Sequence, residues 1–235
     1  MPDRALAGLV VAVVASILVL GCVADAPDSV TSQTQRFDDV IELPPPDLTG
    51  QMTLERALLE RRSRREFAPV ELPLATIGQL LWAGQGITDD RGHRTAPSAG
   101  ALYPLELYAV TATEVFHYVP EGHRIERRSD STTLALLDEA AFGQDHVSTA
   151  PAVLVVVGVD DRTEAEYGAL ASDFVEREAG HASQNILLQA TALDLAAVPV
   201  GGFDPATVAQ LLALPPGHEV MYLVPVGVQV SVDGS

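Results

Sequence analysis

A run of nine residues, "PAVLVVVGV" from Pro151 to Val159, constrains the fold of this chain more than any other feature. The run is apolar throughout and rich in β-branched side chains, with no polar residue at every second position. A strand with one solvated face alternates apolar and polar residues, whereas a strand covered on both faces reads as a continuous apolar run. We therefore expect residues 151–159 to form a strand that is buried on both faces.

Helical periodicity marks the segment that follows, from about residue 164 to residue 195. Apolar residues recur there at steps of three or four, at Val175, Ala179, Ala182, Ile186, Ala190 and Leu193. These steps match the period of an α-helix, and the small residues among them allow another element to approach closely. Shorter helices are predicted after the N-capping residue Thr53 and over residues 74–83, 131–141 and 205–212.

Short strands are predicted on both sides of these helices. "LELYAVTA" and "EVFHYV" are separated by a single residue and predict an antiparallel hairpin. "AVPVGGF" is typical of a strand and a turn, and "VMYLVPVGVQV" predicts a last strand near the carboxyl terminus. Helices and strands in mixed order, with antiparallel pairing early in the chain, indicate an α+β fold.

The amino terminus has the features of an export signal. An apolar run begins at Ala5 and leads into "VLGC", which ends at Cys22, the only cysteine of the chain. These four residues are similar to a bacterial lipobox, in which the cysteine is lipidated and becomes the first mature residue. We expect residues 1–21 to be a lipoprotein signal peptide. The alternative is an uncleaved transmembrane anchor, because the apolar run is about long enough to span a bilayer.

Either alternative places the rest of the chain in the cell envelope, on the extracytoplasmic side of the membrane. Residues 22–50 are rich in Asp, Ser, Thr, Gln and Pro, and we expect them to form a disordered tether between the anchor and a folded domain. Residues 51–230 are expected to form that domain. The sequence thus predicts a globular protein held to the membrane by its lipid anchor.

Composition excludes several classes of function. The net charge of −18 argues against nucleic acid as a partner, because phosphate backbones require a basic surface. With no cysteine after Cys22, disulfides and cysteine-based zinc sites are excluded from the domain. The six histidines show no HExxH spacing, so we expect no metal site. Neither a GxGxxG nor a P-loop motif is present, and Ser98 lacks the GxSxG setting of a hydrolase nucleophile.

Three stretches remain as candidates for ligand binding. "RRSRR" at residues 61–65 places four arginines around a serine, a donor set that matches phosphate oxygens; the alternative is that the arginines cap the end of a helix. Gly201 and Gly202 allow backbone amides to approach a ligand, although an ordinary turn would also use them. The small residues at 96–101, anchored to a strand, are typical of a loop on which something flat and large lies.

Seven motifs in order identify a resemblance. "RRSRREF", "LLWAGQGI", "RTAPSAGALYPLELY", "APAVLVVV", "EAGHASQNILLQATAL", "VPVGGFD" and "VPVG" resemble the nitroreductase superfamily, most closely its SagB/thiazole-oxazole dehydrogenase-like branch. The likeness spans about residues 41–227. It implies an α+β sandwich, in which helices flank an antiparallel-dominated central sheet. It also implies a homodimer that holds FMN in clefts at the dimer interface.

The resemblance assigns roles residue by residue. It implies that the FMN phosphate and ribityl chain are held by Arg61, Arg62, Ser63 and Arg65. The loop lying against the isoalloxazine ring corresponds to Pro97, Ser98, Ala99 and Gly100. The amides of Gly201 and Gly202 correspond to the turn that faces the far edge of the ring. The helix over residues 180–195 is expected to pack across the dimer through its stripe of small residues.

The same comparison sets the expected activity. The resemblance implies an FMN-dependent oxidoreductase that passes two electrons to a small-molecule substrate. The expected envelope location and the net charge of −18 indicate a quinol or a redox protein as donor, in place of a nicotinamide cofactor. The alternative is a flavin- or ligand-binding lipoprotein without turnover. Two departures from the family pattern motivate this alternative: no basic residue lies near the carboxyl terminus, and Ser172-Asp173-Phe174 stands where azoline dehydrogenases carry a Lys-Tyr pair. The catalytic residues are not identified by the sequence.

Overall fold

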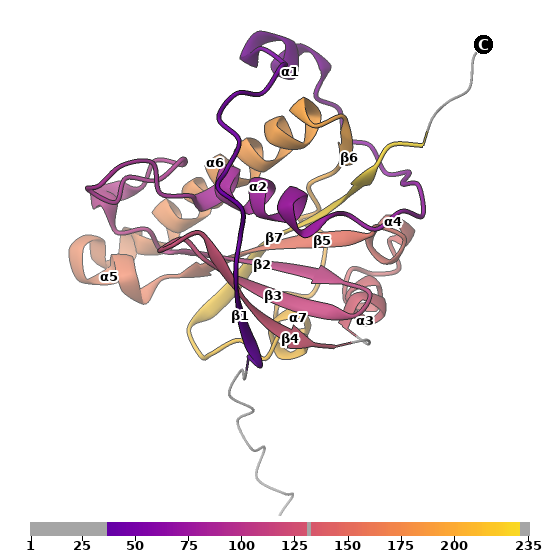
Figure 1. Cartoon of the computed structure of the whole chain (residues 1–235). Helices are drawn as coiled ribbons and strands as arrows, with labels where there is room; N and C mark the ends of the chain where they lie inside the picture. The colour runs from indigo at the N-terminus through magenta and orange to yellow at the C-terminus, as the bar shows by residue number, and fades with distance from the viewer. Residues whose placement is uncertain (1–36, 131–132, 231–235) are drawn as a thin grey trace, which may run out of the picture. The chain divides into compact units, whose positions relative to one another are not determined.

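The computed structural model describes residues 37–130 and 133–230, which form one seven-stranded sheet with helices on both faces (Figure 1). The strand order is β1-β4-β3-β2-β5-β7-β6, and every neighbouring pair is antiparallel. The strands are β1 (Asp39–Glu42), β2 (Leu105–Thr111), β3 (Glu114–Val119), β4 (Arg124–Ser129), β5 (Ala152–Val159), β6 (Leu195–Ala197) and β7 (His218–Val228). The predicted α+β fold is confirmed.

Two groups of helices cover the two faces of the sheet. On one face lie α2 (Leu74–Gln85) and α6 (Ala171–Ala192). On the other lie α3 (Thr133–Ala140), α4 (Asp145–Ser148) and α7 (Pro205–Leu211). Both α1 (Leu54–Glu60) and α5 (Asp161–Tyr167) contact α6, and short 3-10 turns occur at Ala99–Ala101 and Gly168–Leu170.

Strand β5 divides the core into two halves, as its unbroken apolar sequence predicts. Ala152, Leu154 and Val156 face the half that contains α2 and α6, and the residues between them face the half that contains α3 and α7. All eight residues of β5 are buried. A strand in this position touches side chains on both faces, so no polar position is tolerated along it.

Local sequence chemistry sets where the helices begin and end. The Thr53 hydroxyl accepts a hydrogen bond from the Arg56 amide at 3.3 Å, which confirms Thr53 as the N-cap of α1. The Asp204 carboxylate caps α7 in the same way, ahead of Pro205 at the first helical position. The predicted helical segment over 164–195 forms two helices, α5 and α6. They separate at Gly168, whose φ of +54° cannot continue a right-handed helix.

The folded domain begins earlier than residue 51, so the predicted tether over residues 22–50 is wrong in its last part. Residues 39–42 form β1, which pairs with β4, and Leu43 is buried. The Asp47 amide donates to the Gln79 side chain at 2.8 Å. The sequence did not reveal this edge strand for two reasons. Its surroundings are rich in proline, and its hydrogen-bond partner β4 is a charged segment that the sequence did not predict as a strand.

The signal peptide, Cys22 and the first part of the tether lie outside the described residues. Across the described ranges 37–130 and 133–230, no helix combines the length and the apolar character that crossing a membrane requires. The structure therefore concerns the domain alone, and the anchor remains a prediction from the sequence.

The stripe of small residues on α6 is buried, as predicted, but it does not pack across a dimer. Ala179, Ala182, Ile186 and Ala190 are all inaccessible to solvent within the single chain, where they pack on the sheet and α2. A second copy has no access to this face. Any dimer contact through α6 would use other positions, such as the exposed His181 and Gln184.

Candidate functional site

The arginine loop, residues 61–65, follows α1 and is held by its backbone. Ser63 forms a parallel bridge with Ala197 of β6, and the Arg64 amide donates to the Ala197 carbonyl at 3.0 Å. Arg61 is half-buried, and the residues from Arg62 onward are exposed. Because the backbone secures the loop, its guanidinium groups are not needed to hold it.

The charges of this loop are not neutralised by the protein. Among the described residues, no carboxylate forms an ion pair with an arginine of the loop. Most other arginines have such a partner: Arg56, Arg91, Arg94, Arg127, Arg128, Arg162 and Arg177. A chain with 32 acidic residues could have paired them. Four clustered cations without counter-charges fit a multivalent anion such as phosphate.

One arginine of the loop caps the end of a helix, which was the alternative to phosphate binding. Arg62 donates to the carbonyls of Leu59 and Arg61, at 2.9 and 2.8 Å, at the end of α1. The side chains of Arg61, Arg64 and Arg65 make no such bond within the described residues. Arg65 also lies close enough to His146 to act on it: burial, and then the charge of Arg65, lower the pKa of His146. Capping thus accounts for one guanidinium group of the four.

The glycine turn lies further along the same edge of the sheet. Val200 exchanges backbone hydrogen bonds with Leu223 of β7, at 2.7 and 3.0 Å, so the extended chain continues past β6. Gly201 lies four residues beyond Ala197, a distance of about 13 Å at the rise of a strand. The side chain of Gln144, which immediately precedes α4, donates a hydrogen bond to the Gly202 carbonyl at 2.7 Å and holds the turn in place. The arginine loop and the glycine turn thus border one edge.

Neither glycine of the turn is required by the fold itself. A Cβ at Gly201 would meet no atom within 4 Å, and one at Gly202 would meet only the Gln144 amide nitrogen at 3.8 Å. Neither residue has a positive φ. Since packing and backbone conformation would both allow a side chain, what glycine provides here is open space in front of exposed amides, which suits a ligand that approaches the backbone.

The loop at residues 97–103 is held by a buried carboxylate on α6. The Ala99 amide donates to Glu178 at 2.7 Å, and the Tyr103 amide donates to the Ser98 hydroxyl at 2.9 Å. Gly100, Ala101 and Tyr103 have φ values of +60°, +54° and +49°. Side chains at such φ values are strained, so the surrounding contacts must hold the loop in this shape.

Glu178 is the site residue that sequence reasoning missed. It is only 4% exposed, and this burial raises its pKa. The available signal was its place in the helical pattern, beside the buried stripe at Val175 and Ala179, where a carboxylate needs a partner. Its partner is 79 residues away in sequence, which no local pattern indicates.

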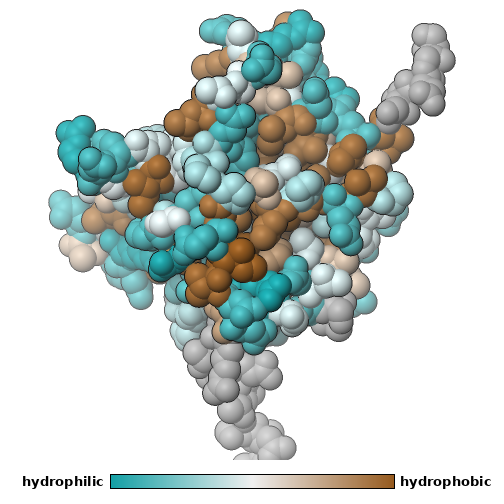
Figure 2. Space-filling model, in the orientation of Figure 1, coloured by the Kyte–Doolittle hydropathy of each residue, from teal (hydrophilic) through white to brown (hydrophobic). Residues whose placement is uncertain are grey.

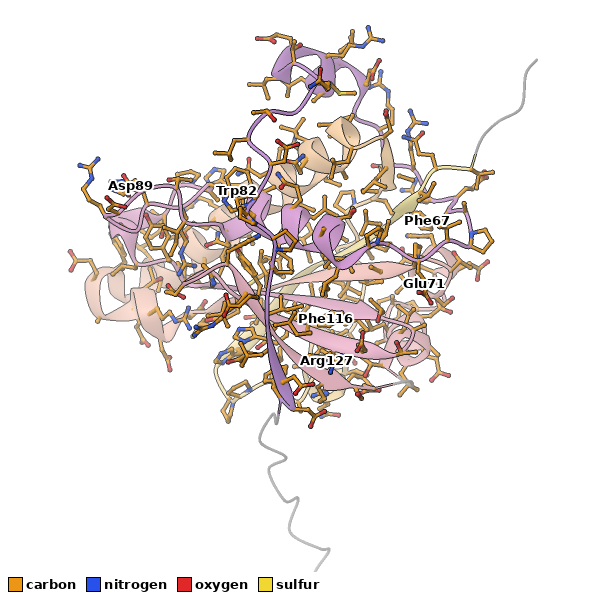
Figure 3. All side chains as sticks on the ribbon, in the orientation of Figure 1. Phe67, Glu71, Trp82, Asp89, Phe116 and Arg127 are labelled. Atoms are coloured by element: carbon orange, nitrogen blue, oxygen red, sulfur yellow. The ribbon has the colours of Figure 1, made fainter. Side chains whose placement is uncertain are left out.

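Within a single chain, the 97–100 loop and the glycine turn lie against different sides of α6. Gly201 shares a cavity of about 350 Å³ with Glu176 and Ala179 of α6. Glu178 follows Glu176 by two residues, which is about 200° around a helix, so the two carboxylates leave α6 on nearly opposite sides. Figure 3 shows the labelled residues Phe67, which follows the arginine loop, and Asp89, which lies between α2 and the 97–100 loop, on opposite sides of the view.

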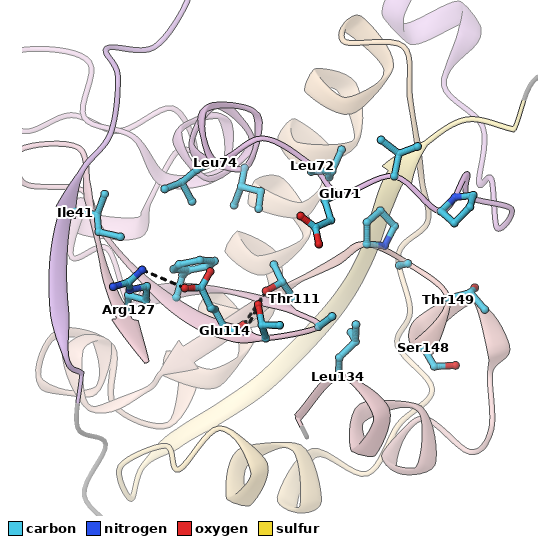
Figure 4. Close-up of a pocket in the computed structure, with 18 residues that line it drawn as sticks. Ile41, Glu71, Leu72, Leu74, Thr111, Glu114, Arg127, Leu134, Ser148 and Thr149 are labelled. Carbon is cyan, nitrogen blue, oxygen red and sulfur yellow. Dashed lines mark hydrogen bonds and ion pairs between the residues drawn. The ribbon is translucent and has the colours of Figure 1, made fainter. Parts of the chain in front are cut away.

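A hollow that shares no residue with these three segments lies on the α2 side of the sheet (Figure 4). It measures about 350 Å³ and is walled by apolar side chains that include Ile41, Leu72, Leu74 and Phe116. Arg127, at one wall, pairs with Glu114 at 3.2 Å. Figure 2 shows hydrophobic side chains reaching the surface on this face. The one arginine that lines it, Arg127, is paired with carboxylates of Glu114 and Asp39.

Comparison with known proteins agrees with this geometry. The model of the nitroreductase family matches residues 58–228. A nitroreductase homologue of Methanocaldococcus jannaschii is 38% identical over 195 residues, which are 80% of this chain and 97% of that protein. The crystal structure of a nitroreductase homologue from Ralstonia eutropha superposes with a TM-score of 0.75 at 30% identity, covering 86% of this chain and 92% of that one.

A more distant structure shares the fold. The NADPH:FMN oxidoreductase of Vibrio harveyi, solved with NAD+, superposes with a TM-score of 0.57 at 22% identity, over 74% of this chain and 68% of that one. The family match covers most of the described domain, including the arginine loop, the 97–103 loop and the glycine turn. On these grounds, the chain belongs to the nitroreductase family.

Proposed function

We propose that this protein is an FMN-dependent oxidoreductase that passes two electrons to a small molecule. The observation that carries the proposal is the edge formed by β6, along which unpaired arginines lead to a turn whose open amides no side chain covers. A phosphate with a chain and a flat ring would extend along such an edge. The Vibrio harveyi neighbour is named for FMN, which supports the choice of cofactor.

Each segment has a role in this proposal. The guanidinium groups of Arg61, Arg64 and Arg65 and the Ser63 hydroxyl bind the phosphate, while Arg62 also holds the end of α1. The amides of Gly201 and Gly202 hydrogen-bond the ring edge. Bound flavin supplies the two-electron redox chemistry, and the protein contributes position, exclusion of water and electrostatics.

The active form is proposed to be a homodimer. One chain keeps its 97–100 loop on a different side of α6 from its own glycine turn, so a single chain leaves the ring without that loop. A second copy would supply it. The dimer is thereby required for the cofactor site and not only for stability.

The arginine loop provides the direct test. Arg61→Ala combined with Arg65→Ala should weaken FMN binding at least about a hundredfold, because each charge-assisted contact contributes roughly 1.5–3 kcal/mol. Arg56→Ala is the matched control: it removes a nearby charge whose partner is Glu60. Fluorescence titration of the apoprotein with FMN measures both. Equal FMN affinity in the double variant and the control would show that the arginine loop does not bind the phosphate.

The SagB-like branch and the envelope location belong to the same proposal. The motif "RTAPSAGALYPLELY" supports the branch, and the lipobox at Cys22 supports the location. Cys22→Ser should prevent lipidation and release the protein from the membrane fraction. An unchanged mass and membrane fraction would favour the transmembrane anchor.

The electron donor is proposed to be a quinol or a redox protein. Reduced nicotinamide cofactors are not expected outside the cytoplasm, and the net charge of −18 slows encounter with anionic dinucleotides. Stopped-flow reduction of the bound flavin tests this. Rapid, saturable bleaching by micromolar NADPH or NADH would instead favour a reduced nicotinamide as donor. NADPH is the donor named for the Vibrio harveyi oxidoreductase.

A non-catalytic flavin-binding protein is the second candidate. The last described strand, β7, contains no lysine or arginine, so it adds no cation to the arginine loop. Bound flavin that dithionite bleaches, but that neither a quinone nor a nitroarene reoxidises, would favour this candidate.

A further inference from the structure

The cavity beside the glycine turn has a distinctive lining. Its apolar part includes the rings of Phe203 and Tyr222 and the side chain of Met221. Two carboxylates, Glu176 from α6 and Glu219 from β7, complete it. Because Gly201 forms part of the same wall, a molecule in this cavity lies next to the amides proposed to hold the flavin ring.

The charged side chains that line this cavity are all negative. Both Glu176 and Glu219 are exposed, and neither forms an ion pair with any described residue. No arginine lines the cavity, and the chain contains no lysine. Two carboxylates without counter-charges attract a cation and repel an anion at close range. The arginine loop, by contrast, lies about 13 Å along the edge strand.

We propose that this cavity binds a small aromatic cation, and that such cations are the class of electron acceptor that the protein prefers. This inference rests on the FMN site proposed above. A planar ring fits against Phe203, Tyr222 and Met221, and a positive charge is favoured both by the aromatic faces and by the two carboxylates. An anionic ring of the same size meets the repulsion of both carboxylates.

For a nitroaromatic acceptor the electron balance is simple. Reduced flavin gives up two electrons and two protons, and the nitro group accepts them to become a nitroso group and water. The reduction therefore requires no reactant beyond the acceptor and the reduced flavin. The carboxylates take no part in this exchange, since their role is to select and orient the ring.

Binding is measured first, without turnover. Benzyltrimethylammonium and benzoate are titrated into the full-length, FMN-loaded protein and followed by ligand NMR. We expect the cation to bind at least about tenfold more tightly than the anion. Glu176→Gln with Glu219→Gln should abolish this preference. Glu42→Gln, which removes one charge at the opposite edge of the sheet, should preserve it.

Turnover is measured second. Dithionite-reduced flavin is mixed with 4-nitrobenzyltrimethylammonium or with 4-nitrobenzoate, and the cation should reoxidise it at least about tenfold faster in the wild type and at similar rates in the double variant. Equal binding of both charges by the loaded wild-type protein overturns the inference and leaves the FMN proposal standing. If the protein takes up no FMN, the proposed function fails, and the NMR titration of the flavin-free protein still decides the charge preference.

Discussion

The buried Glu178 carboxylate accepts a 2.7 Å hydrogen bond from the Ala99 amide and thereby ties the strained 97–103 loop to α6. The two residues come from segments far apart in sequence, and the contact determines where the loop lies. A loop with three positive φ values keeps its shape only while contacts of this kind persist.

Removing this acceptor should loosen the loop. Glu178→Ala leaves the Ala99 amide without its partner and should cost about 1–3 kcal/mol of unfolding free energy, with faster amide exchange across residues 98–103. Glu178→Gln keeps an acceptor oxygen and should lose less. Urea denaturation and hydrogen exchange measure the two effects. Identical protection of the loop in the alanine variant would show that the contact does not hold it.

A substitution in the glycine turn should affect ligand binding but not stability. Gly201→Ala places its Cβ in open space at an ordinary φ, so stability should change by less than about 0.5 kcal/mol while FMN affinity falls. Gly100→Ala is the opposite case: its φ of +60° should cost about 1 kcal/mol of stability. Thermal unfolding and flavin titration distinguish them. Full flavin affinity in Gly201→Ala would remove the turn from the proposed site.

The buried stripe of α6 should respond to charge as a core, not as an interface. Ala182 is inaccessible in the single chain, so Ala182→Glu should destabilise the chain itself by more than about 3 kcal/mol. Gln184→Glu, on the exposed side of the same helix, should leave the unfolding free energy nearly unchanged. Circular dichroism with light scattering reports folding and association together. A folded Ala182→Glu monomer would return the stripe to the dimer interface.

A charged triad on the sheet predicts how stability varies with pH. His117 lies between Glu106 and Glu126, with ring nitrogens 2.7 and 3.0 Å from their oxygens. Burial alone would lower the pKa of His117, but the hydrogen bonds and charges of the two carboxylates outweigh burial and raise it. For Glu106, burial opposes the shift, and His117 and Arg162 nevertheless lower the pKa to about 2.

The sign follows for each group. The His117 contribution is complete below its unfolded pKa of about 6.5 and is lost as pH rises through the higher folded value. The Glu106 contribution is present above its unfolded value of about 4.3 and is lost as pH falls toward about 2. His117→Gln should therefore cost about 2 kcal/mol near pH 6 and progressively less above neutrality. A cost that does not vary with pH would contradict the triad.

Sequence patterns determined the elements that depend on local chemistry. The unbroken apolar run fixed β5 as a central strand, because only a strand covered on both faces excludes every polar residue. Thr53 located the start of α1, and the spacing of Val175, Ala179 and Ala182 predicted a buried helical face. Seven motifs in one order identified the family, which the family match over residues 58–228 confirms.

Only the tertiary structure determined which segments the α6 stripe, strand β1 and the 97–103 loop contact. The α6 stripe packs on the chain's own sheet, and periodicity cannot say whether a buried face contacts the same chain or another. Strand β1 exists because β4 supplies its hydrogen bonds, which its own proline-rich surroundings do not encode. The pairing of Glu178 with Ala99, and the separation of that loop from Gly201 around α6, depend on contacts between distant segments, which become neighbours only when the whole core is packed.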